Sequence, residues 1–129
     1  MAISIVRLGT ARAREEGPRL GTVRRPPRGV PKSDYARQNY YDVWLPNLAP
    51  SAALMADTNV LHDRSRWPAF ARRYEAELKQ PDASRLLDTL AVLSHTADFA
   101  LGCYCEDERF CHRSILRKAL AARGAAIRA

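Results

Sequence analysis

Short apolar runs and helically spaced apolar stripes follow one another along this chain. The apolar runs predict three strands, over residues 2–8, 19–23 and 98–103. Apolar positions at helical spacing predict three longer helices, over 67–79, 83–94 and 110–123, and two short ones, over 35–40 and 52–56. Residues 125–127 form a further candidate for an edge strand. Because strands alternate with helical segments, we expect an α/β fold: a small, largely parallel sheet flanked by helices.

The composition is that of a globular protein that lies in no membrane. At 129 residues and 47% hydrophobic content, we expect a single domain over 1–129 that buries a core without disulfides. No apolar run approaches the roughly 18 residues of a membrane span, and the first residues lack the features of a signal peptide. The three cysteines are an odd number in one short segment, unlike a disulfide framework. We therefore expect a cytoplasmic protein with reduced thiols.

Positive charge is concentrated in the first third of the chain. The net charge is +7, and residues 1–37 carry nine basic side chains against three acidic ones. Within this region, Arg24 to Arg28 belong to a proline-rich loop that we expect to be stiff and extended. Arginine suits phosphate, so this third is a candidate for binding a small anion or a nucleic acid. A compositional bias towards arginine and an ordinary connecting loop are equally compatible with the pattern.

All three cysteines and one histidine lie within ten residues, where a predicted strand ends and a predicted helix begins. In open α/β sheets ligands bind at that junction, and a helix start offers free N–H groups to an anion. Alternation along the strand places Cys103 and Cys105 on one face. The helical stripes turn Cys111 and His112 back towards the sheet. The sequence therefore predicts a functional site here.

Two chemical roles for this cluster involve its thiols directly. Cys111 can act as a nucleophile, with its thiolate stabilised by the helix start and by His112 or Arg113, and His112 can serve as acid or base. The upstream acidic run 106–108 opposes that ionisation. Alternatively, Cys103, Cys105, Cys111 and His112 bind zinc, although their spacing is not one of the usual zinc patterns. Adjacent Cys111 and His112 would also need strain to reach one ion.

A third role makes the cluster part of an anion site. Here His112 and Arg113 hold an anion together with Arg24 and Arg28 of the proline-rich loop, which follows the second predicted strand. In a parallel sheet that loop lies at the same edge as Cys103, which would line the pocket. Small buried cysteines without chemistry are a further interpretation.

The motifs resemble the YeaO-like branch of the bacterial "domain of unknown function 488" family over residues 5–124. The similarity rests on Pro27-Arg28-Gly29 and on Cys111-His112-Arg113. The chain departs from that pattern at Val23 and Pro26, where YeaO-like proteins typically carry Asp and Trp. The resemblance implies a small α/β domain with a pocket that combines Arg24, Arg28, His112 and Arg113, and it implies no particular activity.

Taken together, these patterns favour a protein that binds a small anionic ligand, such as a nucleotide or a phosphorylated metabolite. Catalysis by Cys111 and His112 is an open option, with Arg24, Arg28, Cys103 and Arg113 as ligand-binding residues. The alternatives are a nucleic-acid-binding module and a zinc-stabilised protein without catalysis. No pattern in the sequence indicates a cofactor or an oligomeric state.

Overall fold

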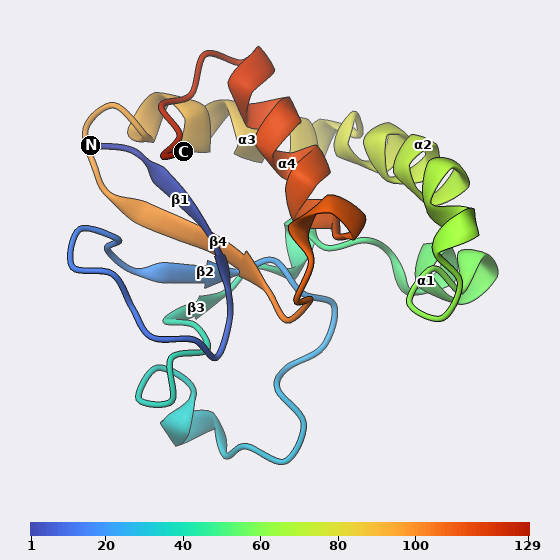
Figure 1. The fold of residues 1–129 in the computed structure, drawn as a ribbon. Coiled ribbons are helices and arrows are strands. Elements are labelled where there is room, and N and C mark those ends of the chain that lie inside the picture. Colours follow the sequence, from blue (N-terminus) through green and yellow to red (C-terminus); the bar gives the residue numbers. More distant parts are fainter.

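Four parallel strands form the centre of the computed structural model, which describes all residues 1–129 (Figure 1). They are β1 (Ile3–Arg7), β2 (Arg19–Gly21), β3 (Val43–Trp44) and β4 (Phe99–Cys103), in the sheet order β1-β4-β2-β3. Every pairing is parallel, so the carboxyl ends of all four strands meet at one edge. β4 is buried along its whole length, as expected for a strand with neighbours on both sides. The α/β fold expected from the sequence is confirmed.

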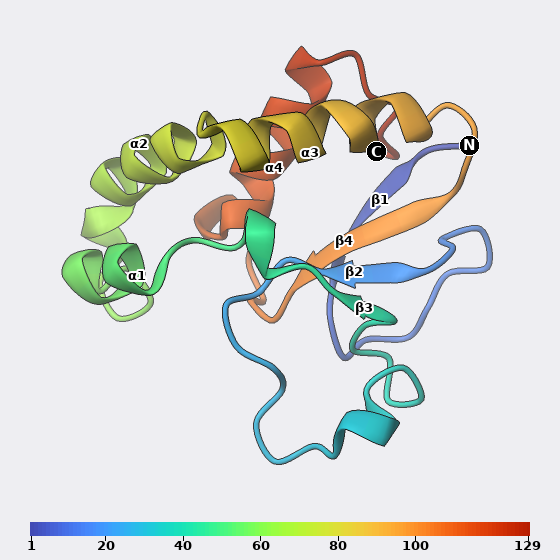
Figure 2. The same cartoon turned by 180° about the vertical axis from the view of Figure 1, so that it is seen from behind.

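Four α-helices gather on one side of the sheet in both views of the ribbon (Figures 1 and 2). They are α1 (Ala52–Thr58), α2 (Trp67–Leu78), α3 (Pro81–Leu93) and α4 (His112–Ala122). Proline in the first turn starts α2 and α3, where its missing N–H and fixed φ are tolerated. The Ser51 side chain caps α1 by accepting from the Leu54 N–H. Four short 3-10 turns occupy Lys32–Asp34, Pro46–Leu48, Arg64–Arg66 and Glu108–Phe110.

The main core lies between the helices and the sheet. Apolar stripes of α2, α3 and α4 belong to one buried cluster with residues of β1 and β4, because residues 3.6 positions apart share a face of each helix. Tyr74 of α2 is fully buried, and its hydroxyl donates to the Leu48 carbonyl at 2.5 Å. Sixteen buried residues form this cluster: Ile3, Leu48, Leu54, Val60, Phe70, Tyr74, Leu78, Ala83, Leu87, Leu90, Ala91, Phe99, Leu101, Ile115, Leu116 and Leu120.

A second, smaller cluster surrounds the thiols and includes the tyrosine-bearing segment between β2 and β3. The Tyr41 ring fills the space where a Cβ on Gly21 would lie, only 2.3 Å from its nearest atom, so glycine is required there. The buried members of this cluster are Leu8, Val23, Tyr41, Cys103 and Cys111. The tyrosines of this segment therefore pack mainly as core beside the cysteines.

Three predictions about local structure need correction. Residues 35–40 form turns rather than a helix, and the 3-10 turn Lys32–Asp34 precedes them. Val43 and Trp44 form the edge strand β3, which the sequence did not predict because it is only two residues long and both are exposed. Residues 125–127 contribute a single bridge, between Ile127 and Ile3, and not a full strand. The longer helices and the three predicted strands lie where they were expected, within one to three residues at most of their ends.

None of the helices combines the length and the apolar character needed to cross a membrane.

Candidate functional site

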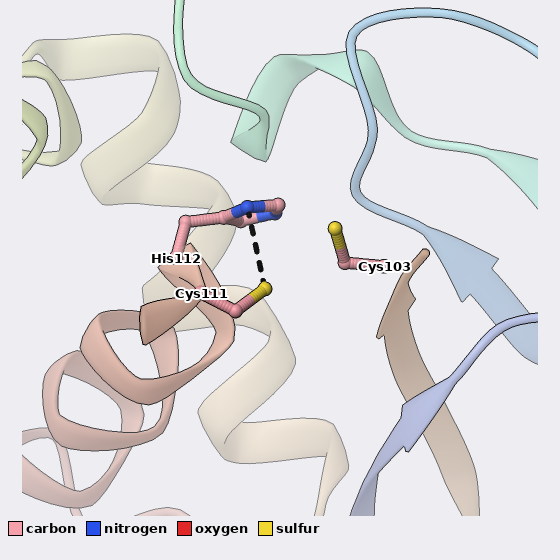
Figure 3. Close-up of side chains that lie close together, drawn as sticks. All are labelled: Cys103, Cys111 and His112. Atoms are coloured by element: carbon pink, nitrogen blue, oxygen red, sulfur yellow. Dashed lines mark hydrogen bonds between the residues drawn. The ribbon is translucent and has the colours of Figure 1, made fainter. Parts of the chain in front are cut away.

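The chain places the site where β4 ends and α4 begins. β4 delivers Cys103 to the carboxyl edge of the sheet. A turn then carries the chain back, and the Asp107 side chain caps it by accepting from the Arg109 N–H at 3.0 Å. Cys111 is the N-cap residue of α4 and His112 its first residue, so both side chains meet the end of β4 (Figure 3). All three cysteines are free thiols.

A backbone carbonyl fixes the orientation of His112. Its Nε2 lies 2.6 Å from the Thr22 carbonyl oxygen, and because a carbonyl only accepts, Nε2 carries the proton. The other ring nitrogen, Nδ1, is then free to accept and lies 3.9 Å from Cys111 Sγ. The edge-to-face packing of the ring on Tyr74 holds the imidazole in this position. The geometry is that of a thiol beside a general base.

Arg113 adds a buried positive charge to the same sulfur. Its side chain is 3% exposed, and Nε donates to Cys111 Sγ at 3.3 Å. A second guanidinium nitrogen donates to the Cys105 carbonyl at 2.5 Å. No carboxylate forms an ion pair with Arg113. The Cys111 sulfur is therefore the group that can balance this buried charge, and it can do so only as a thiolate.

The three thiols differ in how readily they ionise. The pKa of Cys111 lies far below its usual value, because Cys103 and Cys105 act as hydrogen-bond donors to its sulfur and because His112 is close, although burial opposes the shift. The pKa of Cys103 is raised by its hydrogen bonds to Cys105 and Cys111 and by burial. For Cys105, the hydrogen bond with Cys103 lowers the pKa, but Cys111 and burial raise it, to about 11. These shifts favour ionisation of Cys111 over ionisation of Cys103 and Cys105.

Cys103, Cys111 and His112 also form a compact group of potential metal ligands. One ligand atom from each lies within 4.8 Å of the others, and all three residues are buried. Figure 3 shows the three side chains pointing towards a common centre. Such a group is close enough together to hold a metal ion.

A cavity of about 610 Å³ opens beside these residues. Cys103, Cys105, Cys111 and His112 line one side of it, and residues from α1, the loop after α1 and α2 line the other. Twelve of its eighteen lining residues are hydrophobic, so it suits a ligand with an apolar part. Arg24, Arg25 and His62 supply its basic groups.

Residues 3–124 match the model of the DUF488-N3a group, which is described as the active DUF488-N3 subclade. The chain belongs to the DUF488 family. No curated protein and no solved structure matches it. The family resemblance inferred from the Pro-Arg-Gly and Cys-His-Arg motifs is thus supported over nearly the whole chain.

In this DUF488 member, the residues expected at the site are only partly brought together. Arg24, Cys103, Cys111 and His112 line the cavity, and Arg113 lies behind Cys111. Arg28 is exposed and does not line the cavity.

The guanidinium of Arg24 is largely occupied by the protein itself. It donates to the carbonyls of Pro46, Ala49 and Pro50 at 3.0 to 3.2 Å, which fixes the segment before α1. Two of its nitrogens are thereby occupied, and less of its donor capacity is left for a ligand.

Two residues that contribute to the site, Thr22 and His62, were not predicted from the sequence. Thr22 supplies its carbonyl to His112 across 90 residues, and its hydroxyl lies 3.3 Å from the same nitrogen. No side-chain pattern marks a residue whose role lies in its backbone. His62 lines the cavity from the loop after α1, where an isolated exposed histidine gives little signal.

Proposed function

We propose that this protein is an enzyme that uses Cys111 as a thiolate nucleophile against a small substrate bound in the cavity. The observation that carries this proposal is the buried guanidinium of Arg113, which has the Cys111 sulfur and no carboxylate as its partner. The description of the matched subclade as active supports catalysis as well. His112 Nδ1 would take the thiol proton and return it to the leaving group.

The cavity favours a substrate with an apolar body and an anionic group. Its hydrophobic lining would bury the body, and Arg25 and His62, both exposed, would meet the charge. An anionic ligand agrees with the interpretation of the sequence, but Arg25 replaces Arg28 as its expected partner. Assignment to the YeaO-like branch stays a prediction.

The pH dependence of alkylation tests the proposal. Trypsin cuts after Arg109 and Arg113, so Cys111 is recovered in the short peptide 110–113 while Cys103 and Cys105 share the peptide 86–109. The first peptide should react with iodoacetamide at nearly the same rate at pH 6 and pH 8, because a thiolate with a low pKa is already ionised. The second peptide should react much faster at pH 8 than at pH 6.

Unfolded protein in urea supplies the control, since all three thiols should then follow the pH dependence of a free cysteine, with a pKa of about 8.5. Comparing rates across pH removes the effect of burial, which slows the reagent equally at both values. A Cys111 peptide that follows the free-cysteine profile in the folded protein would disprove the thiolate.

Metal binding is the competing function, because Cys103, Cys111 and His112 converge. Zinc and iron should therefore be measured first, on untagged protein purified without chelator. A stoichiometric metal, together with a melting temperature that falls on chelation, would replace the nucleophile with a metal-stabilised protein.

Nucleic-acid binding by the basic first third stays a prediction. It requires affinity for an oligonucleotide that falls steeply with salt. The exposed side chains of Arg25 and Arg28 are the residues to substitute in that measurement.

A further inference from the structure

Two further thiols, Cys103 and Cys105, lie beside the proposed nucleophile Cys111, and a simple nucleophilic enzyme needs neither. Cys103 Sγ belongs to the group within 4.8 Å that also contains Cys111 Sγ and His112. Cys105 Sγ lies 3.7 Å from Cys103 Sγ. A disulfide requires sulfurs about 2.05 Å apart, so two of these neighbouring sulfurs must move closer together for one to form.

We infer that the three cysteines form a redox centre that reduces hydrogen peroxide, with Cys111 as the attacking thiolate and Cys103 as the resolving thiol. This inference rests on the proposed thiolate, and it adds a substrate class and a second catalytic cysteine. The cavity wall formed by Cys103, Cys105 and Cys111 gives peroxide access to the sulfurs. Arg113 Nε–H points at the attacking sulfur and lies close enough to polarise a peroxide oxygen bound there.

The first step forms a sulfenic acid. The Cys111 thiolate attacks one peroxide oxygen, an S–O bond forms, and the O–O bond breaks. The leaving hydroxide takes the proton that His112 Nδ1 accepted from the thiol and departs as water. The sulfur is oxidised and the peroxide is reduced.

The second step closes the disulfide. Cys103 loses its proton to His112 and its sulfur attacks the sulfur of Cys111, so an S–S bond forms and the S–O bond breaks. The leaving hydroxide takes that proton and departs as a second water. An external dithiol then reduces the disulfide by exchange, becomes a disulfide itself, and restores both cysteines. In total, one peroxide and one dithiol are converted to two waters and one disulfide.

Cys103 is the better resolving residue than Cys105. Its sulfur lies in the same close group as Cys111 and His112, from which Cys105 is absent. Cys105 also lies close to both sulfurs, 3.7 Å from Cys103 Sγ and in a hydrogen bond with Cys111, but only Cys103 has both Cys111 and His112 in the close group. Cys105→Ser is therefore the matched control for Cys103→Ser.

The experiment treats the reduced protein and its Cys103→Ser and Cys105→Ser variants with hydrogen peroxide in the presence of dimedone, which traps sulfenic acid. In the wild type and in Cys105→Ser we expect a disulfide that links peptide 86–109 to peptide 110–113, with little trapped adduct. In Cys103→Ser we expect about tenfold more dimedone adduct or sulfinic acid on Cys111, because the resolving thiol is missing. Fragmentation between Cys103 and Cys105 locates the linked sulfur, so the wild type alone decides the matter if a variant does not fold.

A link to Cys105 instead of Cys103, or equal trapping in wild type and Cys103→Ser, would overturn the redox inference. The alkylation profile separates this failure from that of the proposed function. Rapid alkylation of Cys111 at pH 6 without disulfide formation would leave the nucleophile intact and remove only the peroxide chemistry. Steady turnover of peroxide with dithiothreitol, lost in both Cys103→Ser and Cys111→Ser, completes the expected result.

Discussion

Two arginines are buried in this molecule, at opposite ends of the sheet, and they have different partners. Arg19 begins β2 and is 1% exposed, and its guanidinium donates to the Glu16 carboxylate and to the carbonyls of Thr10, Ala11 and Asn39. Arg113 lies beyond the carboxyl end of β4, and its guanidinium donates to the Cys105 carbonyl and to the Cys111 sulfur.

Under the proposed function, this difference separates an arginine that stabilises the fold from one that supports the nucleophile. The Glu16 carboxylate is charged at every pH near neutrality, so Arg19 is balanced permanently and fastens β2 to the preceding loop. Arg113 is balanced only when a thiol gives up its proton. A buried cation whose partner is an ionisable sulfur favours the thiolate, which is the reactive form of that sulfur.

Removing the partner of Arg19 should have the largest effect on stability. Glu16→Ala leaves a buried guanidinium without its counter-charge, and the free energy of unfolding should fall by about 3–5 kcal/mol. Urea denaturation at pH 7 measures this. The matched control is Asp34→Ala, which breaks the exposed pair with Arg37 and should cost under about 0.5 kcal/mol. Equal losses in the two variants would show that the Arg19 pair is not effectively buried.

Removing the partner of Arg113 should have a smaller but distinct effect. Cys111→Ser keeps the shape but is neutral, and it should lower the free energy of unfolding by about 2 kcal/mol, the value of a hydrogen bond to a charged group. Adding Arg113→Met to Cys111→Ser should restore part of that loss, because the unpaired charge is removed as well. Urea denaturation of the two single variants and of the double variant gives the coupling free energy between Cys111 and Arg113. If the losses of the two single variants add up to that of the double variant, the sulfur is not ionised.

The contributions of Glu16 and Cys111 to stability should change over different ranges of pH. Burial raises the pKa of Glu16, but its hydrogen bond with Arg19 and nearby cations bring it below 4.5, so its contribution is present above about pH 4.5 and is lost as the pH falls through the folded-state pKa. The pKa of Cys111 is lowered on folding, so its ionised form stabilises the folded protein fully above the unfolded-state pKa of about 8.5. This stabilisation is lost progressively as the pH falls below that value.

Between pH 8.5 and 6.5, wild type should therefore lose about 1.4 kcal/mol per pH unit more than Cys111→Ser, as one proton is bound on unfolding. Parallel urea titrations of the two proteins measure the difference. Identical slopes would contradict a thiolate in the folded protein. Glu16→Gln should be less stable than wild type at neutral pH, and its slope should differ from that of wild type only below about pH 4.5, where wild type loses the Glu16 charge.

The smallest effect is expected at Arg28, which is exposed and lines no part of the cavity. Arg28→Ala should change the free energy of unfolding by less than about 0.5 kcal/mol. It should also leave the alkylation rate of Cys111 unchanged, because no contact joins the two residues. Slower alkylation of Cys111 in this variant, measured on the peptide 110–113, would show that Arg28 does contribute to the site.

Features that depend on neighbouring residues could be predicted from the sequence. The position of the site followed from a buried run that leads into an amphipathic helix, so Cys103, Cys111 and His112 were brought together correctly. Features that depend on distant contacts could not. The Thr22 carbonyl that orients His112 and the loop carbonyls that surround Arg19 become partners only when the sheet forms.

The edge strand β3 shows the same limit. Its two residues are half exposed and carry no alternating pattern, because its pairing with β2 and the bond from the Trp44 indole to the Val23 carbonyl define it rather than its own burial. Arg113 was predicted either to stabilise the Cys111 thiolate or to hold an anionic ligand, and the structure shows its guanidinium donating to the Cys111 sulfur. Side-chain direction in the first turn of a helix cannot be read from periodicity alone.

The sheet order also determines when the site can form during synthesis. β4 separates β1 from β2, and its register places Ile3 against Phe99, so β1 has no strand to pair with until the ribosome has made β4. Pairing β1 with β4 requires closing a long loop, which slows folding. Until that moment the emerging chain exposes the apolar faces of α2 and α3, a state that chaperones bind. Because Cys103 ends β4 and Cys111 begins α4, the cysteine cluster can assemble only after β4 has joined the sheet.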